Sequence, residues 1–177
     1  MNRRMLLTRI VAGFTAVGFV GFSIPFIRSW IPAVSGDVVL DVDLSDLATG
    51  KIQQVRWLGR NVLLIRRDKT SLETLGNTPL EDAASSAAQQ PKFAKNEHRS
   101  LKPEHLVVYA NCTHLGCEVA ARFEDSFEGF NCPCHFSRFD AAGRVEKGSA
   151  AKLNLEVPDY EYIGREVIRL KQVKANA

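Results

Sequence analysis

The sequence lacks acidic residues over its first 36 positions and has four cysteines in its whole length. All 20 Asp and Glu residues lie from Asp37 onward, where they face 19 of the 23 Lys and Arg residues. That larger region is therefore close to neutral, which gives no electrostatic reason to expect a nucleic-acid partner. The chain also has no internal repeat, no haem-binding motif and no second long apolar run, so it does not contain a multi-span membrane domain.

Charge is likewise missing from Ile10 to Ile27, an apolar run of eighteen residues. As a helix this run would be about 27 Å long, close to the hydrocarbon thickness of a bilayer. Arg28 and Trp30 follow it as an interfacial anchor. Three arginines precede the run and one follows it, which predicts a cytoplasmic N-terminus and an external remainder. Residues 1–30 are therefore predicted to be a cytoplasmic stub and a transmembrane anchor.

A removable signal peptide is the alternative for this segment, because Ala33-Val34-Ser35 resembles a small-residue cleavage site. The run is longer than a usual signal core, and Pro25 and Arg28 interrupt the approach to that site. We therefore expect the anchor to remain uncleaved and residues 31–37, which are turn-forming, to act as a hinge. The adjacent arginines at positions 3 and 4 are typical of the export route for folded proteins.

The remainder reads as an antiparallel β domain. Alternating apolar residues predict a strand within 37–47, and a second segment, 55–67, predicts two strands around a turn at Gly59-Arg60-Asn61. Further strands are expected at 105–110 and, around Pro158 and Gly164, near the C-terminus. The polar stretch 76–100 is predicted to be a long surface excursion. No helix is expected in this domain, and the cysteines fall on two of its loops.

Those loops carry "CTHLGC" at 112–117 and "CPCHFSRFD" at 132–140. Two cysteines and two histidines could hold a tetrahedral zinc ion, or a [2Fe–2S] cluster with both cysteines on one iron and both histidines on the other. Each loop has one cysteine more than zinc requires. A disulfide between the extra cysteines would clamp the loops, and it would persist in the oxidising compartment that the topology predicts. A cluster protein outside the cytoplasm should also cross the membrane folded, in keeping with the paired arginines.

The sequence resembles the bacterial Rieske iron–sulfur subunit of ubiquinol–cytochrome c reductase, the cytochrome bc complex. The resemblance rests on the two cysteine boxes and on "PFIRSW" after the apolar run, "NEHRSLKPEHLVV" before the first box and "LNLEVP" after the second. It implies a mainly β fold: a Rieske-type antiparallel β-sandwich head with a cluster-binding subdomain, on one N-terminal transmembrane helix. The implied head spans 38–177, and its cluster-binding part covers about 108–151.

The resemblance implies one Rieske [2Fe–2S] cluster. Cys112 and Cys132 would bind its inner iron, and His114 and His135 its outer iron. Both histidines are then candidates for quinol contact and proton acceptance, and the family uses the one that matches His135. Reducing the cluster adds negative charge and raises the basicity of an attached imidazole, so electron and proton uptake are coupled.

Three further roles follow from the resemblance. Cys117 and Cys134 would form the disulfide, and the Ser137 hydroxyl would hydrogen-bond a bridging sulfide. Leu115 matches the residue that shields the cluster and packs into the quinol site, although simple packing within the loop would explain a leucine equally well.

The implied function is electron transfer from quinol, bound at a cytochrome b subunit, to a c-type cytochrome. The chain would be one subunit of a dimeric oxidoreductase and not active alone. It would lie in the bacterial inner membrane as a single span with a periplasmic cluster domain.

Two residues of the second box depart from the family pattern, and the segment 147–151 lacks the proline that the family has there. Phe136 stands where the family has glycine, and Phe139 stands where it has a tyrosine whose hydroxyl bonds the sulfur of the residue matching Cys112. Hydrogen bonds to sulfur raise the cluster potential, so Phe139 predicts a lower potential than in tyrosine-containing relatives. One alternative is therefore a lower-potential paralogue in another membrane electron-transfer complex. A zinc-stabilised periplasmic binding domain is a second, and a ring-hydroxylating oxygenase ferredoxin, which would lack the anchor and the disulfide pair, is a third.

Overall fold

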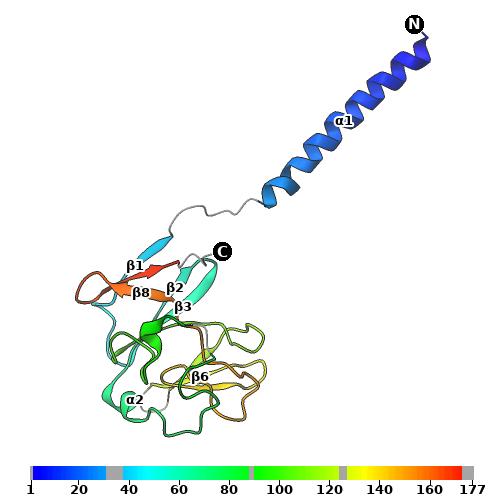
Figure 1. The fold of residues 1–177 in the computed structure, drawn as a ribbon. Helices are drawn as coiled ribbons and strands as arrows, with labels where there is room; N and C mark the ends of the chain where they lie inside the picture. The colour runs from blue at the N-terminus through cyan, green and yellow to red at the C-terminus, as the bar shows by residue number, and fades with distance from the viewer. Residues whose placement is uncertain (1, 31–37, 88–89, 124–126, 173–177) are drawn as a thin grey trace. The chain divides into compact units, whose positions relative to one another are not determined.

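The computed structural model describes residues 2–30, 38–87, 90–123 and 127–172 (Figure 1). The chain divides into two compact units, Met1–Asp37 and Val38–Ala177. The predicted hinge, 31–37, lies outside the described residues.

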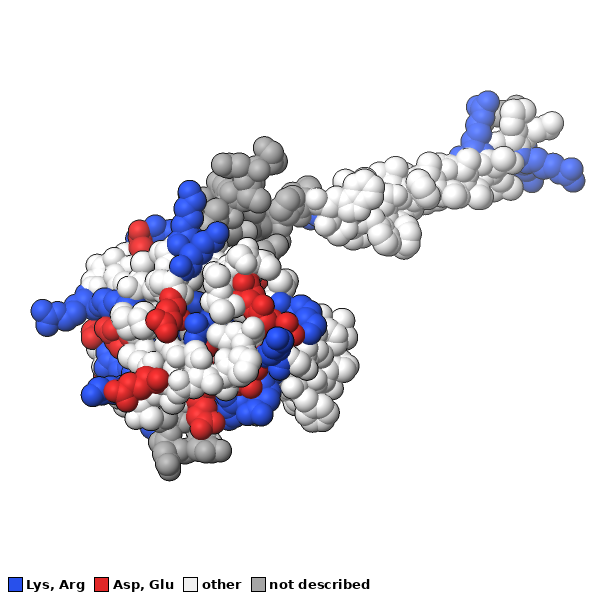
Figure 2. All heavy atoms as spheres, turned by 60° about the horizontal axis from the view of Figure 1, so that its bottom comes forward, with Lys and Arg blue, Asp and Glu red and all other residues white. Residues whose placement is uncertain are grey.

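The first unit is one long helix, α1, Arg3–Ser29. Its 27 residues give a length of about 40 Å, and none of them is buried. Thr8, Thr15 and Ser23 each return the side-chain hydroxyl to the carbonyl four residues earlier, at 2.8–2.9 Å. Figure 2 shows the surface of α1 without charge along its middle and basic at its N-terminal end. The helix is long and apolar enough to cross a membrane, and these three hydroxyl groups are satisfied within it.

The second unit, called the head below, contains three antiparallel sheets of three strands among the described residues. The first has the order β1 (Val39–Asp43), β9 (Val167–Lys171), β8 (Asp159–Tyr162). The second has the order β2 (Ile52–Trp57), β3 (Arg60–Arg66), β4 (His105–Tyr109). The third has the order β5 (Ala120–Phe123), β6 (Phe127–Asn131), β7 (Arg138–Asp140). The predicted mainly β class is confirmed.

The core runs through all three sheets. Strand β4 is buried at every position, and β3 is buried from Val62 to Ile65. These continuous apolar runs reflect burial on both faces of the strand. Strand β4 leads directly into the first cysteine box, so the most buried strand of the head positions that loop.

The turn between β2 and β3 lies earlier than predicted. Trp57 pairs with Arg60, so Leu58 and Gly59 alone form the loop, with φ of 50° and 77°. Two residues in the left-handed region give the tight hairpin turn whose twist matches that of the strands. The predicted turn was wrong in including Arg60 and Asn61, which belong to β3.

Two other predictions for the head were wrong. The stretch 76–100 is not only a surface excursion, because Ser85, Ala94 and Arg99 within it are at most 1% exposed. Its described residues also include a 3-10 turn, η1, Lys92–Ala94. The head does contain a short helix, α2, Lys69–Glu73, which begins where the side chain of Asp68 accepts a hydrogen bond from the Ser71 N–H at 2.7 Å.

Candidate metal centre

The two cysteine boxes fold into loops with the same backbone pattern, here called loop 1 (112–117) and loop 2 (132–137). In each, the first residue donates its N–H to the carbonyl of the sixth, and the fifth donates back to the carbonyl of the first. The four bonds are Cys112 to Cys117 (2.7 Å), Gly116 to Cys112 (2.8 Å), Cys132 to Ser137 (2.8 Å) and Phe136 to Cys132 (3.0 Å).

The loops place sulfur inside and imidazole outside. The free thiols Cys112 and Cys132 are 3% and 2% exposed. His114 and His135 are exposed, and their rings lie nearly perpendicular, with centroids 4.8 Å apart. Neither imidazole ring hydrogen-bonds another described residue. Two thiols and two unpartnered imidazoles therefore converge at one end of the head.

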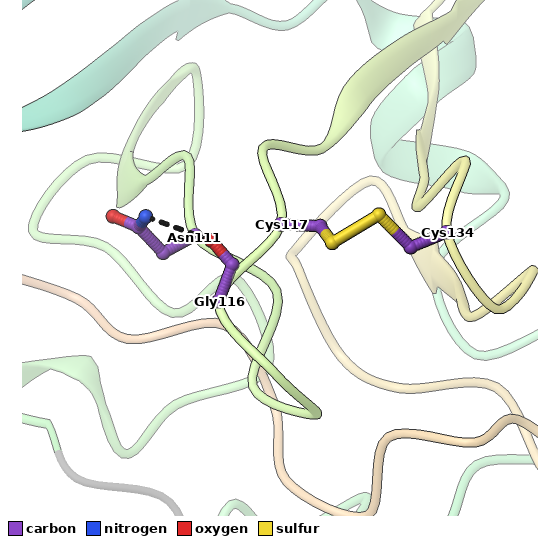
Figure 3. The surroundings of a disulfide bond; sticks show 4 residues. All are labelled: Asn111, Gly116, Cys117 and Cys134. Carbon is purple, nitrogen blue, oxygen red and sulfur yellow. Dashed lines mark hydrogen bonds between the residues drawn. A yellow bond between two sulfur atoms is a disulfide. The ribbon is translucent and has the colours of Figure 1, made fainter.

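A disulfide between Cys117 and Cys134 joins loop 1 to loop 2 (Figure 3). The two residues are 17 positions apart in sequence and 6.6 Å apart at Cα. Their sulfurs and that of Cys132 all lie within 4.8 Å of one another. Sulfurs bonded to each other cannot act as thiolate ligands, so Cys112 and Cys132 are the thiols that remain available for a metal.

The protonation of Cys112 also fits a metal site. Burial raises the pKa of the Cys112 thiol, and the neighbouring Cys132 raises it further. The backbone N–H of His114 and the Ser137 hydroxyl oppose this by hydrogen-bonding the sulfur. A buried thiol pair becomes thiolate when a metal cation replaces its protons. Soft sulfur and imidazole donors suit an iron–sulfur cluster or zinc, and not the hard cations that prefer oxygen.

Loop 1 is held by a chain of polar side chains that sequence reasoning missed. Asn111 donates from Nδ2 to the Gly116 carbonyl at 3.2 Å (Figure 3) and accepts from Arg60 Nε at 3.2 Å. Arg60 pairs with Glu156 at 2.7 Å and lies over the Tyr109 ring, 3.6 Å from its centroid. Only an asparagine next to the first cysteine could have signalled this support from the sequence.

Loop 2 is held by buried hydroxyls. Ser137 is fully buried, its Oγ accepts the Ala151 N–H at 2.9 Å, and its hydroxyl lowers the pKa of the Cys112 thiol. Ser149 Oγ accepts the Arg138 N–H at 3.1 Å. Ser137 therefore connects loop 2 to Cys112 of loop 1 and to the backbone at Ala151.

Strands β6 and β7 support loop 2 from both sides. Phe130 pairs with Phe139, and both are fully buried. The strands approach so closely at Gly129 that a Cβ there would lie 2.0 Å from the Phe139 carbonyl oxygen. Only glycine fits this position. Phe139 thus fills the core beside the site with an apolar ring and offers no hydroxyl to the cysteine sulfur.

Two buried arginines hold the segment that follows β7. Arg99 donates to the carbonyls of Ala142 (3.2 Å), Gly143 (3.1 Å) and Leu155 (2.6 Å). Arg67 donates to Ala141 O at 3.0 Å. Burial lowers the pKa of both arginines to about 10, so both remain charged at neutral pH. Sequence reasoning gave these residues no role, because most of their partners are backbone carbonyls, with Ser100 and Gln90 as the side-chain partners.

Leu115 and Phe136 lie at the exposed surface of the same end, with 71% and 82% of each residue accessible. Leu115 is therefore largely open to solvent, and its role stays a prediction. The predicted ligands, the disulfide and Ser137 are brought together by the structure, while the ligand roles themselves remain predictions.

This fold and site define a class: a β head that holds an iron–sulfur centre between two disulfide-joined loops. The family model that matches residues 37–161 is described as the Rieske [2Fe-2S] domain. The chain belongs to the Rieske iron–sulfur family, as the sequence boxes predicted, and its cofactor is a [2Fe–2S] cluster.

Relatives extend the likeness over the whole chain. The ubiquinol-cytochrome c reductase iron-sulfur subunit of Allochromatium vinosum is 37% identical, over 100% of this chain and 91% of its own length. The protein of the same name from Blastochloris viridis is 35% identical over 96% of this chain and 92% of its own. A chain of a hyperthermophilic respiratory complex III shares the fold, with a TM-score of 0.50, 18% identity and coverage of 90% and 98%.

Proposed function

We propose that this chain is the electron-transfer subunit of a quinol–cytochrome c reductase. The observation that supports this most directly is the division of the site into buried thiols and exposed imidazoles. It sets the histidine edges toward a reaction partner and keeps the sulfurs away from water. The names of the full-length relatives point to the same assembly.

In this proposal Cys112 and Cys132 would bind the inner iron of the cluster, and His114 and His135 would bind its outer iron. The cluster would supply one-electron redox chemistry at this site. Ser137 donates a hydrogen bond at the sulfur side, where it already contacts Cys112. The disulfide of Cys117 with Cys134 keeps the two loops together and excludes water from the sulfurs.

The histidines perform the proton chemistry at the outer edge. Each has an exposed ring without a hydrogen-bond partner among the described residues. The free nitrogen of His135 accepts the hydrogen bond of the quinol hydroxyl and then its proton, which is the role of a general base. The proton stays on that nitrogen until the head meets solvent again.

The remaining assignments concern assembly and topology. A cytochrome b subunit would bind the quinol, a c-type cytochrome would take the electron, and the complex would be a dimer. Helix α1 fits a single membrane anchor. Its basic N-terminal end lies in the cytoplasm and the head in the periplasm, after export of the folded protein with the anchor uncleaved.

The test is low-temperature EPR of dithionite-reduced membranes that contain the chain, titrated over redox potential. We expect a rhombic Rieske signal that follows a one-electron curve, together with quinol–cytochrome c reductase activity. His135→Gln removes both, whereas His98→Gln, which changes a histidine outside the two loops, keeps both. A chain that binds zinc and gives no EPR signal contradicts the proposal.

A second function is favoured by one residue: Phe139 is fully buried and has no hydroxyl to stabilise the reduced centre. The same chain would then serve another membrane complex, with a quinol of lower potential. A midpoint as high as in tyrosine-containing relatives excludes this alternative, and a clearly lower midpoint favours it over ordinary ubiquinol oxidation.

A further inference from the structure

His105 begins strand β4 at the end of that strand opposite to loop 1, and it is only 2% exposed. Both nitrogens of its ring have partners in the head. Nδ1 lies 2.7 Å from the hydroxyl oxygen of Tyr162, and Nε2 accepts a hydrogen bond from Arg66 Nε at 3.2 Å. Arg66 pairs with His105 across β3 and β4, whereas Tyr162 ends β8 in the first sheet. The imidazole therefore connects the first sheet to the second.

The partners determine the protonation state of this ring. The nitrogens of an arginine side chain are all donors, so Nε2 of His105 has to be the acceptor and carries no proton. The single proton of a neutral imidazole is then on Nδ1, which donates to the Tyr162 oxygen. Burial raises the pKa of Tyr162, so its hydroxyl stays neutral. This pair of hydrogen bonds exists only while His105 is neutral.

The charged groups around His105 do not favour a second proton on its ring. Arg66 contacts Nε2 and also pairs with Glu166, in the turn between β8 and β9, whose Oε2 lies 3.7 Å from Nε2. Lys102 and Glu104 come just before His105 in the chain. Burial lowers the pKa of His105 most, Arg66 comes next and Lys102 contributes, while Glu104 and Glu166 oppose them. Because Glu166 is already paired with Arg66, an added proton would place two cations in contact.

We propose that His105 is a pH-sensitive connection between the two sheets: the neutral ring joins β8 to β3 and β4, and a ring that gains a proton gives up Arg66 and weakens this junction. The proposal involves neither the cluster nor the quinol, so it does not rest on the proposed function. It assigns a role to a histidine that lies outside both cysteine loops.

The pH dependence of this connection has a definite sign. The pKa of His105 in the folded head lies below the ordinary value of about 6.5, so the unfolded chain takes up the proton more readily. The stability that the neutral ring contributes is therefore complete above about pH 6.5 and is lost as the pH falls below that value. One proton changes the unfolding equilibrium constant by at most about tenfold for each pH unit.

The experiment uses the full chain with its cluster, in detergent, from about pH 5 to about pH 8. Chemical denaturation measures the unfolding equilibrium constant, and hydrogen exchange measures the protection of β4 and β8 relative to intrinsic exchange rates. His105→Gln does not titrate, and its amide oxygen can still accept from Arg66. Tyr162→Phe removes the acceptor of Nδ1–H but leaves the histidine titratable. His98→Gln is the matched control, because His98 is the other histidine outside the two cysteine loops.

We expect the unmodified chain to lose stability relative to His105→Gln as the pH falls below about 6.5, by up to about tenfold in the unfolding equilibrium constant per pH unit. His98→Gln should follow the unmodified chain at every pH. Tyr162→Phe should be less stable at the alkaline end and still depend on pH. In the unmodified chain, acid should lower the protection of β4 and β8 more than that of β6. His114 and His135 are present in every variant, so their titration cancels in these comparisons.

Three results would overturn the proposal. The unmodified chain and His105→Gln could show the same pH dependence, in which case His105 does not titrate within the folded head. The unmodified chain could gain stability over His105→Gln in acid, which would mean that a protonated His105 pairs with Glu166 and strengthens the junction. The third result is equal protection of β4 and β8 at both ends of the pH range. This last measurement needs only the unmodified chain, so it decides the question even if His105→Gln does not fold.

Discussion

Loop 1 and loop 2 share one backbone pattern but are held in different ways. Loop 1 depends on Asn111, Arg60 and Glu156, a chain of partly exposed polar groups. Loop 2 depends on Ser137 and on the strands beside it, which are buried. Water and salt can replace or screen the first kind of support and cannot reach the second. The support of loop 1 is therefore accessible to solvent, whereas the support of loop 2 is buried. The variants below test that difference.

The largest effect is expected when the connection between the loops is broken. Cys117→Ser combined with Cys134→Ser removes a bridge across 17 residues of sequence, and a loop of this size contributes about 3 kcal/mol. We expect chemical denaturation to show a loss of this order, and the EPR signal to decay faster in air. The double alanine variant is the control for the serine hydroxyls. Unchanged stability in both variants would mean that the loops hold together without the disulfide.

Ser137→Ala tests the buried support of loop 2. It leaves the buried Ala151 N–H without its acceptor and takes a donor from the Cys112 sulfur. An orphaned buried donor costs about 2 kcal/mol, and the midpoint potential should fall because the reduced centre loses a hydrogen bond. Denaturation and redox titration measure the two effects, with Thr49→Ala at the exposed surface as control. A midpoint that does not fall would show that this hydroxyl does not act on the redox centre.

Phe139→Tyr adds a connection between the loops. The new hydroxyl should bond the Cys112 sulfur and raise the midpoint potential by about 40 mV, which corresponds to one hydrogen bond of about 1 kcal/mol. Phe130→Tyr, in the pairing partner of Phe139, is the control for adding a hydroxyl to this part of the core. An unchanged or lower midpoint in Phe139→Tyr would show that β7 does not direct the ring edge at the sulfur.

Asn111→Ala tests the solvent-accessible support of loop 1. It should cause the smallest loss of stability, about 0.5–1 kcal/mol. It removes the link between Arg60 and the Gly116 carbonyl, both at the surface of the head. We expect the loss of stability to shrink in high salt, unlike that of Ser137→Ala. If the two variants cost the same at every salt concentration, the two loops do not differ in the way proposed.

Sequence reasoning succeeded where chemistry fixes residue type and spacing. Cysteine and histidine at their intervals predicted a zinc or [2Fe–2S] site, the family resemblance predicted the cluster, and apolar alternation predicted most strands. It failed where the partner of a side chain is backbone. Arg99 lies in a polar stretch that predicted a surface segment, yet it is fully buried. Its guanidinium donates to the backbone carbonyls of Ala142 and Leu155. Every residue type has such a carbonyl, so the sequence does not identify these partners. The same holds for Leu58, whose φ, and not its identity, places the β2–β3 turn.

The disulfide described above also allows the redox state of the protein to be determined by counting its free thiols. All four cysteines belong to the site, two in the bridge and two as free thiols. Alkylation under denaturing conditions should therefore label two cysteines when the bridge is intact and four when it has been reduced. The mass of the alkylated chain therefore shows whether the two loops are still joined, before any spectrum is recorded.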